Sequence, residues 1–280
     1  MNAGLDWRNP TGQRTASQLF NFPLSFPSTP RVSIGLTNVN VEDIAGGNTV
    51  GLSVYADAIS GDGFMLNLVA VGDTLPHIID GVWIAIPPYA VKNGIQYQTG
   101  QYSTLQTREQ GPGVQQTMER IYFPYKFSSS PQILVWINGF EFSTNKNWRI
   151  KTYATDIDMT GFVIHVDTWN DTQLWVGNVS WLAYPASATN AVSGFMRPAN
   201  VHDLGGSTWA DIVNVDWPIE KKTGQTPTVL EGYSGFEEDN NSFLRFECYG
   251  NTTAAGMVRQ IGGAAQSRYR DGNVSYLAIF

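Results

Sequence analysis

The stretch Trp148–Tyr184 reads WRIKTYATDIDMTGFVIHVDTWNDTQLWVGNVSWLAY, and its pattern decides the fold of the chain. Polar and apolar residues alternate through Arg149–Lys151 and again through Ile164–Asp167, which is the period of half-buried β-strands. Thr160-Gly161 separates these two runs and is typical of a turn, since glycine adopts positive φ at no steric cost. A polar loop, 169–172, then precedes a third run. The stretch therefore predicts two strands joined by a turn, a loop and a third strand.

The same features recur along the chain at the spacing of a whole domain. A glycine opens the second run of each copy, at Gly63, Gly161 and Gly256, and a closing aromatic follows 20 residues later, at Trp83, Trp181 and Tyr276. A proline precedes an apolar run in each copy, at Pro30, Pro131 and Pro227, and a glycine lies near each start, at Gly4, Gly100 and Gly194. We predict three domains, 1-88, 95-185 and 191-280, joined by linkers at 87–94 and 185–190 that lack periodicity.

Composition limits the class of protein. The 280 residues include 28 glycines, 12% aromatic and only 15% charged residues, which favours many short strands and turns over helices. A net charge of −7 argues against nucleic acid or an anionic membrane as partner. The apolar runs are too short to insert into a membrane. The first ten residues show no secretory signal, and the single cysteine, Cys248, cannot form an intrachain disulfide, so we expect a cytoplasmic or non-classically secreted protein.

The central copy resembles the H-type lectin family. The shared residues are Arg149 at the start of a strand, Gly161-Phe162 after the turn, Thr168-Trp169 before the loop and Ser180-Trp181 at the close. An upstream run also fits, with Phe123, Phe127 and Pro131 before Ile133, Val135 and Ile137. Members of this family are six-stranded β-sandwiches that bind galactose and N-acetylgalactosamine and form homotrimers. The resemblance implies an all-β fold of three tandem six-stranded antiparallel β-sandwich domains arranged as an intrachain pseudo-trimer. A generic antiparallel sheet with a tryptophan-rich core is the alternative.

The resemblance also implies a sugar site that spans two neighbouring domains. One domain supplies an arginine, whose planar fork can hold two ring hydroxyls, and an acid; the other supplies loop aromatics. By position, the candidate forks are Arg149 and Arg245, and the candidate cover is Trp169, Asn170 and Trp175. Asn170 stands where a family member has histidine. The acid stays open: its position falls near Pro112, beside Glu109, whereas the third copy offers Asp203 and Asp211.

Only the second copy keeps both the arginine and the loop tryptophan. The first copy has Gly51 and Val71 at these two positions, and the third keeps Arg245 but has no tryptophan in its loop. One sense of the ring places Trp169, Asn170 and Trp175 opposite Arg245. In the other sense, the loop faces Gly51 and Arg149 meets the loop of the third copy, so that the family site is broken everywhere. Both arginines also fit ordinary exposed strand residues, and Trp83, Trp181 and Tyr276 fit the core.

Other chemistry has little support in the sequence. The three histidines, His77, His165 and His202, lack metal-ligand spacing, so we expect no metal and no cofactor. An acidic group, Asp156, Asp158, Asp167 and Asp171, is compatible with a calcium site or a glycosidase pair, but its alternation favours solvated turn residues.

The sequence thus predicts a non-enzymatic lectin for galactose- or N-acetylgalactosamine-containing glycans, monomeric with internal pseudo-threefold symmetry. Two alternatives remain: a structural or protein-interaction scaffold without sugar binding, and a glycoside-active enzyme.

Overall fold

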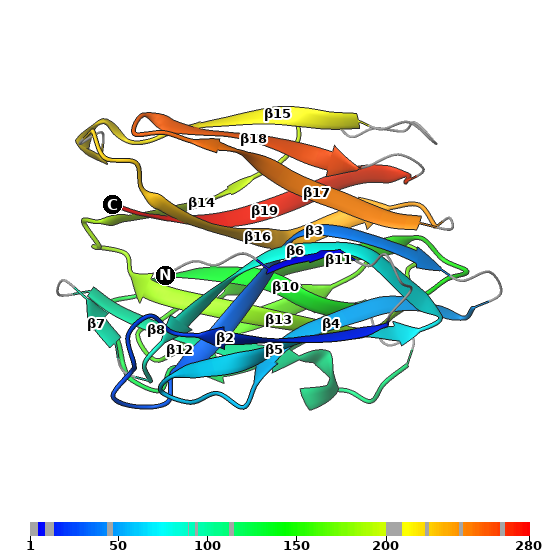
Figure 1. Cartoon of the computed structure of the whole chain (residues 1–280), viewed down its shortest axis with the longest axis horizontal. Coiled ribbons are helices and arrows are strands. Elements are labelled where there is room, and N and C mark those ends of the chain that lie inside the picture. The colour runs from blue at the N-terminus through cyan, green and yellow to red at the C-terminus, as the bar shows by residue number, and fades with distance from the viewer. Residues whose placement is uncertain are drawn as a thin grey trace.

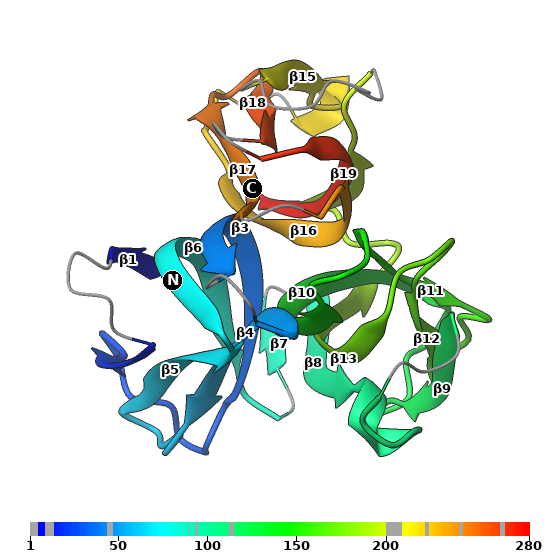
Figure 2. The ribbon, with the colours of Figure 1, turned by 90° about the vertical axis from the view of Figure 1, so that its right-hand side faces the viewer.

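A computed structural model describes residues 5–8, 14–43, 47–88, 90–92, 95–111, 115–199, 209–221, 224–240, 243–263 and 267–280. Its strands form three groups, one after another along the chain, and the groups lie around a common axis (Figures 1 and 2). In the part of the chain that the structure describes, no helix is long and apolar enough to cross a membrane. The predicted fold class, an all-β arrangement of three antiparallel β-sandwiches, is confirmed.

Each group supplies six strands to one sandwich. The first unit contains β1 (Leu5–Arg8), β2 (Thr15–Asn21), β3 (Arg31–Asp43), β4 (Thr49–Asp57), β5 (Gly63–Gly72) and β6 (Thr74–Ile86). The second contains β8 (Ile95–Ser103), η1 (Thr104–Gln106), β9 (Gln116–Tyr122), β10 (Pro131–Ser143), β11 (Trp148–Thr155), β12 (Gly161–Asp167) and β13 (Leu174–Pro185). The third contains β14 (Ala191–Met196), β15 (Trp209–Asp216), η2 (Ile219–Lys221), β16 (Thr228–Glu238), β17 (Phe243–Thr252), β18 (Gly256–Gly263) and β19 (Tyr269–Ile279).

A short strand, β7 (Ala90–Lys92), lies in the first predicted linker and pairs with β8. The linker thus has more structure than its sequence indicated, because its backbone extends the edge of a sheet. The domain boundaries 1-88, 95-185 and 191-280 stay a prediction.

Each of the three sheets is shared between two units. Their strand orders are β1-β6-β3-β17-β18-β15, β2-β5-β4-β10-β13-β8-β7 and β14-β19-β16-β11-β12-β9. The joins, which we call seams, are the antiparallel pairs β4–β10 between units one and two, β11–β16 between units two and three, and β17–β3 between units three and one. Every unit therefore uses one sheet for each neighbour, and the ring closes within one chain.

The repeated glycines have a common structural cause. A Cβ at Gly63, Gly161 or Gly256 would lie 2.1–2.4 Å from a carbonyl oxygen of the neighbouring strand, so a side chain does not fit. Just before each glycine, a side-chain oxygen of Ser60, Asp158 or Thr253 accepts backbone N–H bonds from the turn. Hydroxyl and carboxylate side chains of this kind stabilise tight turns. The three hairpins are therefore built by one device.

The sandwich cores are aromatic. The closing residues Trp83, Trp181 and Tyr276 are 3%, 2% and 7% exposed, as predicted. The rings of Phe22, Phe123 and Trp217 pack against them with centroids 6.0–6.2 Å apart. Gly100 and Gly194 leave room for these aromatics, because a Cβ there would lie 2.7–2.8 Å from Trp181 or Tyr276. Gly4, the matching glycine of the first unit, lies outside the described residues.

A second core lies where β3, β10 and β16 contact one another around the axis (Figure 2). At the position five residues after each repeat proline, the three strands carry Gly35, Trp136 and Gly232. Trp136 is fully buried, and a Cβ on either glycine would lie 3.0–3.1 Å from its ring. The indole N–H donates to the carbonyl of Ser275, 3.0 Å away. One tryptophan therefore fills the layer for all three strands.

Candidate functional site

One strand of each seam carries a β-bulge at the same place, in its pairing with a strand of its own unit. The register shifts between Leu36 and Asn38 in β3, between Ile137 and Gly139 in β10, and between Tyr233 and Gly235 in β16. The skipped residues, Thr37, Asn138 and Ser234, are polar and 9%, 3% and 6% exposed. A bulge bends the strand and re-aims its side chain. Polar groups are thus placed under each seam, and cavities lie over two of them.

The β11–β16 seam carries the first predicted arginine. Arg149 is paired with Glu237 in the register of the two strands, so a residue of unit two faces one of unit three. Its Nε donates to Glu237 at 2.9 Å, and its Nη1 donates to Asp171 at 2.7 Å and Thr172 at 3.3 Å. Its side chain is only 7% exposed. The structure therefore uses this guanidinium to tie the loop of unit two to strand β16.

A groove of 750 Å³ runs beside this seam. The groove is lined by residues of two units. Unit two contributes Lys151, Tyr153 and Trp169, among others, and unit three contributes Phe195, Arg197, Glu237, Asp271 and Asn273, among others. Ser234, the bulge residue, also lines the groove. Phe195 is 73% exposed, so its ring is open to a ligand in the groove. Aromatic faces with a few fixed polar groups are typical of ligand pockets.

The polar side chains of the groove are held in fixed orientations. The Tyr153 ring stacks on His165 with centroids 4.4 Å apart, and its hydroxyl donates to Asp167 at 2.7 Å. Burial, together with this hydrogen bond to a carboxylate, raises the pKa of Tyr153 to about 12, so the hydroxyl stays protonated at neutral pH. On the opposite wall, Nε of Arg197 donates to both carboxylate oxygens of Asp271, 3.0 and 3.1 Å away. These bonds raise the pKa of Arg197.

The predicted cover residues are separated by the fold. Trp169 lines the groove, as its aromatic role would require. Asn170 is exposed at the loop tip with a positive φ of 56°, and its carbonyl accepts from Gln115. Trp175 is half-buried at the start of β13 and does not line the groove; its indole nitrogen is buried without a hydrogen-bond partner. Only Trp169 of the three therefore faces the groove.

Arg245 does not meet Trp169, so the predicted pairing of these two residues is wrong. Arg245 lies on β17, and its Nε donates at 2.7 Å to Asn40 of unit one across the third seam. Its guanidinium also lies over the Phe243 ring, 4.0 Å from the centroid. Arg149 faces unit three, as in the other predicted sense of the ring, but Trp169 faces unit three as well, while Gly51 pairs with Glu141 of β10. Neither predicted sense therefore describes where the loop of unit two lies. The residues shared with the family predicted where the arginines lie in the strands. The pairing of strands between units decides which residues each arginine contacts.

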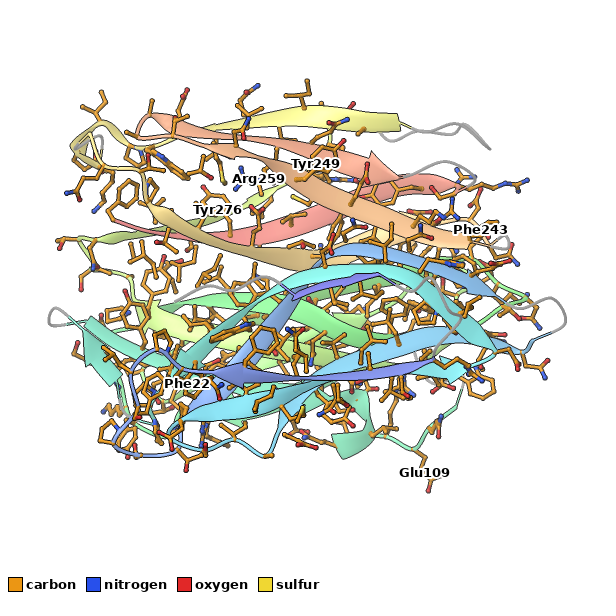
Figure 3. The ribbon with its side chains drawn as sticks, in the orientation of Figure 1. Phe22, Glu109, Phe243, Tyr249, Arg259 and Tyr276 are labelled. Carbon is orange, nitrogen blue, oxygen red and sulfur yellow. The ribbon has the colours of Figure 1, made fainter. Side chains whose placement is uncertain are left out.

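The candidate acids are also dispersed. Asp211 lies on β15, an edge strand separated from Arg245 by β18. Glu109 projects from the surface of unit two (Figure 3). Pro112, Asp203 and His202 lie outside the described residues, as does the loop 264–266 of the third copy. The acids that bind Arg149 are instead Glu237 of the neighbouring unit and Asp171 of its own loop.

The acidic cluster of unit two divides into separate structural roles. Asp158 caps the hairpin turn and accepts from Arg120, and hydrogen bonds from Thr160 lower its pKa. Asp167 accepts from Tyr153, and Asp171 pairs with Arg149. No group of three or more His, Cys, Asp or Glu within the described ranges is placed to hold a metal ion.

Most of the groove could not be predicted from the sequence of unit two, because half of its wall comes from unit three. Phe195, Arg197 and Asp271 belong to the third copy, which has weak family markers. A usable signal was present in the bulges: Asn138-Gly139 and Ser234-Gly235 each place a polar residue and a glycine inside an apolar strand. An isolated glycine in a strand pattern indicates a bulge or a close backbone approach.

A ring of β-sandwiches with an aromatic and polar groove at an inter-unit seam has the features of a ligand-binding module. Comparison with known families is more specific. Residues 17–86 and 119–184 match the family model of the H-type lectin domain, so the resemblance seen in the sequence is confirmed for these two segments. The matched residues cover most of the first and second units and end before the third.

No curated protein matches the sequence. Two solved structures of discoidin II from Dictyostelium discoideum are similar to the chain at 13% identity. One covers 64% of this chain and 81% of its own length with a TM-score of 0.30, and the other covers 64% and 80% with a TM-score of 0.28.

Proposed function

We propose that the chain is a non-enzymatic lectin that binds galactose- or N-acetylgalactosamine-containing glycans in the groove at the β11–β16 seam. The observation that carries the proposal is the position of Trp169, a residue of the family pattern, in the wall of a 750 Å³ inter-unit groove. An aromatic face there can cover the apolar C–H patch of a pyranose. Lys151 and Asn273 supply hydrogen-bond donors to ring hydroxyls, and the Asn273 amide oxygen is an acceptor.

Arg149 is a positioning residue in this proposal. Its guanidinium already binds Glu237 and Asp171, so its fork is not free to hold sugar hydroxyls. By fixing Glu237 and the loop that carries Trp169, it keeps both walls of the groove in place. Fixed walls reduce the entropy lost when a ligand binds.

The ion pairs of Arg149 also favour one alternative function, a structural scaffold that has lost sugar binding. In the scaffold, the ion pairs at the seam would only join units two and three. Glycan binding separates these two functions, because a scaffold predicts none. Turnover of a chromogenic galactoside would instead support the glycoside-active enzyme.

A glycan array with the purified chain, followed by calorimetry on the best glycan, tests the proposal. We expect Trp169→Ala and Tyr153→Ala to weaken binding about tenfold or more, because buried aromatic anchors dominate recognition. Tyr249→Ala is the matched control: Tyr249 follows Arg245 by four residues as Tyr153 follows Arg149, and it lies on β17, the strand that forms the third seam with β3. Absence of galactose-type glycans among the hits, or equal binding by Trp169→Ala, would overturn the proposal.

A further inference from the structure

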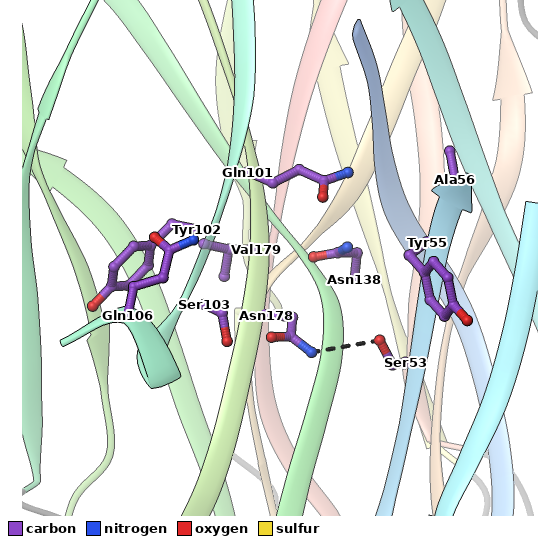
Figure 4. Close-up of a pocket in the computed structure, with 10 residues that line it drawn as sticks. All are labelled: Ser53, Tyr55, Ala56, Gln101, Tyr102, Ser103, Gln106, Asn138, Asn178 and Val179. Atoms are coloured by element: carbon purple, nitrogen blue, oxygen red, sulfur yellow. Dashed lines mark hydrogen bonds between the residues drawn. The ribbon is translucent and has the colours of Figure 1, made fainter. Parts of the chain in front are cut away.

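A second cavity lies at the β4–β10 seam, at the position that matches the groove. Its volume is 320 Å³, and its polar and aromatic lining includes Ser53, Tyr55, Gln101, Ser103, Asn138 and Asn178 (Figure 4). The strand registers relate the two cavities: Gly139 pairs with both Ser53 and Asn178, and Gly235 pairs with both Lys151 and Asn273. Ser53 therefore replaces Lys151, Asn178 matches Asn273, and Tyr55 matches Tyr153.

The chemistry of this cavity differs from that of the groove. None of the residues that line it is an acid, a lysine, an arginine or a histidine, whereas the groove is lined by Lys151, Arg197, Glu237 and Asp271. Amide and hydroxyl groups provide paired donors and acceptors without charge. This lining is complementary to an uncharged ligand with several hydroxyl groups.

The bulge residue Asn138 supplies an independent sign of a ligand. Its side chain is 3% exposed, and its Nδ2 donates to the Val54 carbonyl at 3.0 Å, which fixes the orientation of the amide. Its Oδ1 is buried and accepts no hydrogen bond, although the residue lines the cavity. A buried acceptor without a donor costs about 1–3 kcal/mol. A ligand hydroxyl that entered the cavity would supply the missing donor.

The other groups are arranged around that oxygen. Asn178 and Ser53 lie on the two strands that flank Gly139, and the Asn178 amide donates to the Ser53 hydroxyl at 3.4 Å (Figure 4). Gln101 approaches from β8, and Tyr55, 37% exposed, lies on the far side on β4 (Figure 4). Two units thus supply an aromatic face opposite a set of amides. The volume is at the lower end for ligand pockets, which corresponds to a single sugar ring.

We propose that this cavity is a second binding site, separate from the groove, for one uncharged hexose unit whose hydroxyl donates to Oδ1 of Asn138. The inference rests on the proposed function only in taking a glycan as the class of ligand. The two sites are inequivalent, so a chain binds two sugars with different affinities.

Asn138→Ser is the decisive variant, because serine already occupies the matching bulge position at residue 234. Calorimetry and side-chain amide NMR with methyl β-galactopyranoside and methyl N-acetyl-α-galactosaminide would measure both sites. We expect Asn138→Ser to weaken one of two binding events about tenfold and to leave the other unchanged. Gln101→Ala, at an exposed position, should weaken the same event, which guards against a folding defect in the first variant. High salt should not change this event, because no charged side chain lines the cavity.

The outcomes separate this inference from the proposed function. Loss of one event in Asn138→Ser and of the other in Trp169→Ala supports both sites. A single event that Trp169→Ala abolishes and Asn138→Ser leaves intact overturns the second site and keeps the groove. A single event that only Asn138→Ser and Gln101→Ala weaken supports the cavity and overturns the groove. Binding of neither probe overturns both.

Discussion

The second and third units have the same strand plan but place charge differently. Inside unit two, Ile164 and Val135 are buried and apolar, and in unit three the matching positions hold Arg259 and Glu231. Nε of Arg259 donates to both oxygens of Glu231, at 2.9 and 2.7 Å, between the two sheets of the sandwich (Figure 3). Phe142 of unit two likewise corresponds to Glu238 of unit three, and both are fully buried.

This difference shows that a unit can keep the backbone fold while its residues depart from the sequence pattern of the family. Unit three keeps its turns, bulge and closing aromatic while its interior has changed from apolar to charged. The segments that match the family model lie in the two units whose corresponding positions are apolar. Fusion into one chain lets each unit change alone, because its neighbours are no longer copies of itself.

The largest effect that we expect comes from breaking the buried ion pair of unit three. Arg259→Ile introduces the residue of unit two and leaves Glu231 buried without its partner, which should cost about 3–5 kcal/mol of unfolding free energy. The double variant Arg259→Ile/Glu231→Val should recover this loss and match or exceed the wild type. Urea unfolding measures both. A double variant as unstable as the single one would show that unit three cannot take the core of unit two.

A smaller effect should separate the two seam arginines. Arg149→Met leaves Glu237 and Asp171 without a charged donor and should cost about 1.5–3 kcal/mol. Arg245→Met removes a bond to Asn40, a contact with the Phe243 ring and the attraction of Glu238 and Glu42, but Arg245 is only half-buried, so we expect a smaller loss of about 1 kcal/mol. Thermal and urea unfolding of the two variants should rank them in this order. The reverse order would mean that the β17–β3 seam depends more on its arginine.

The smallest effect should come from Glu238→Gln, which keeps an oxygen for the Arg245 N–H. Burial raises the pKa of Glu238 well above its ordinary value of 4.5, with hydrogen bonds from the Arg245 and Arg268 backbone opposing the shift. The folded chain therefore binds this proton more tightly than the unfolded chain. Wild-type stability should fall as pH rises from about 4.5 through the raised pKa, and this contribution should be absent from the variant. Melting temperatures at pH 4 and pH 8 test it; identical pH profiles would contradict it.

No change of mass is expected on dilution. Each of the three seams is formed within the chain, so light scattering should give a monomer at all concentrations. A stable trimer of chains would contradict the closed ring.

The sequence carried the fold better than the site. Gly63, Gly161 and Gly256 could be recognised because steric exclusion by a neighbouring carbonyl acts at the same place in every copy. Trp169 was identified because a loop tryptophan is a local marker. The partners of Arg149 could not be identified, since Glu237 lies 88 residues away and meets it only through the pairing of β11 with β16. The residues that form a turn are close together in the sequence. The residues that meet across a seam depend on which units are neighbours in the ring.

The central layer of Gly35, Trp136 and Gly232 has an evolutionary consequence. Three copies of unit two would bring three indoles into a space that holds one, and three copies of unit three would place only glycines there and leave a void. Neither unit could form a homotrimer of this arrangement unless the residues of this layer changed. A large residue and two small ones, divided among the repeats, therefore fit together only when three different units are joined.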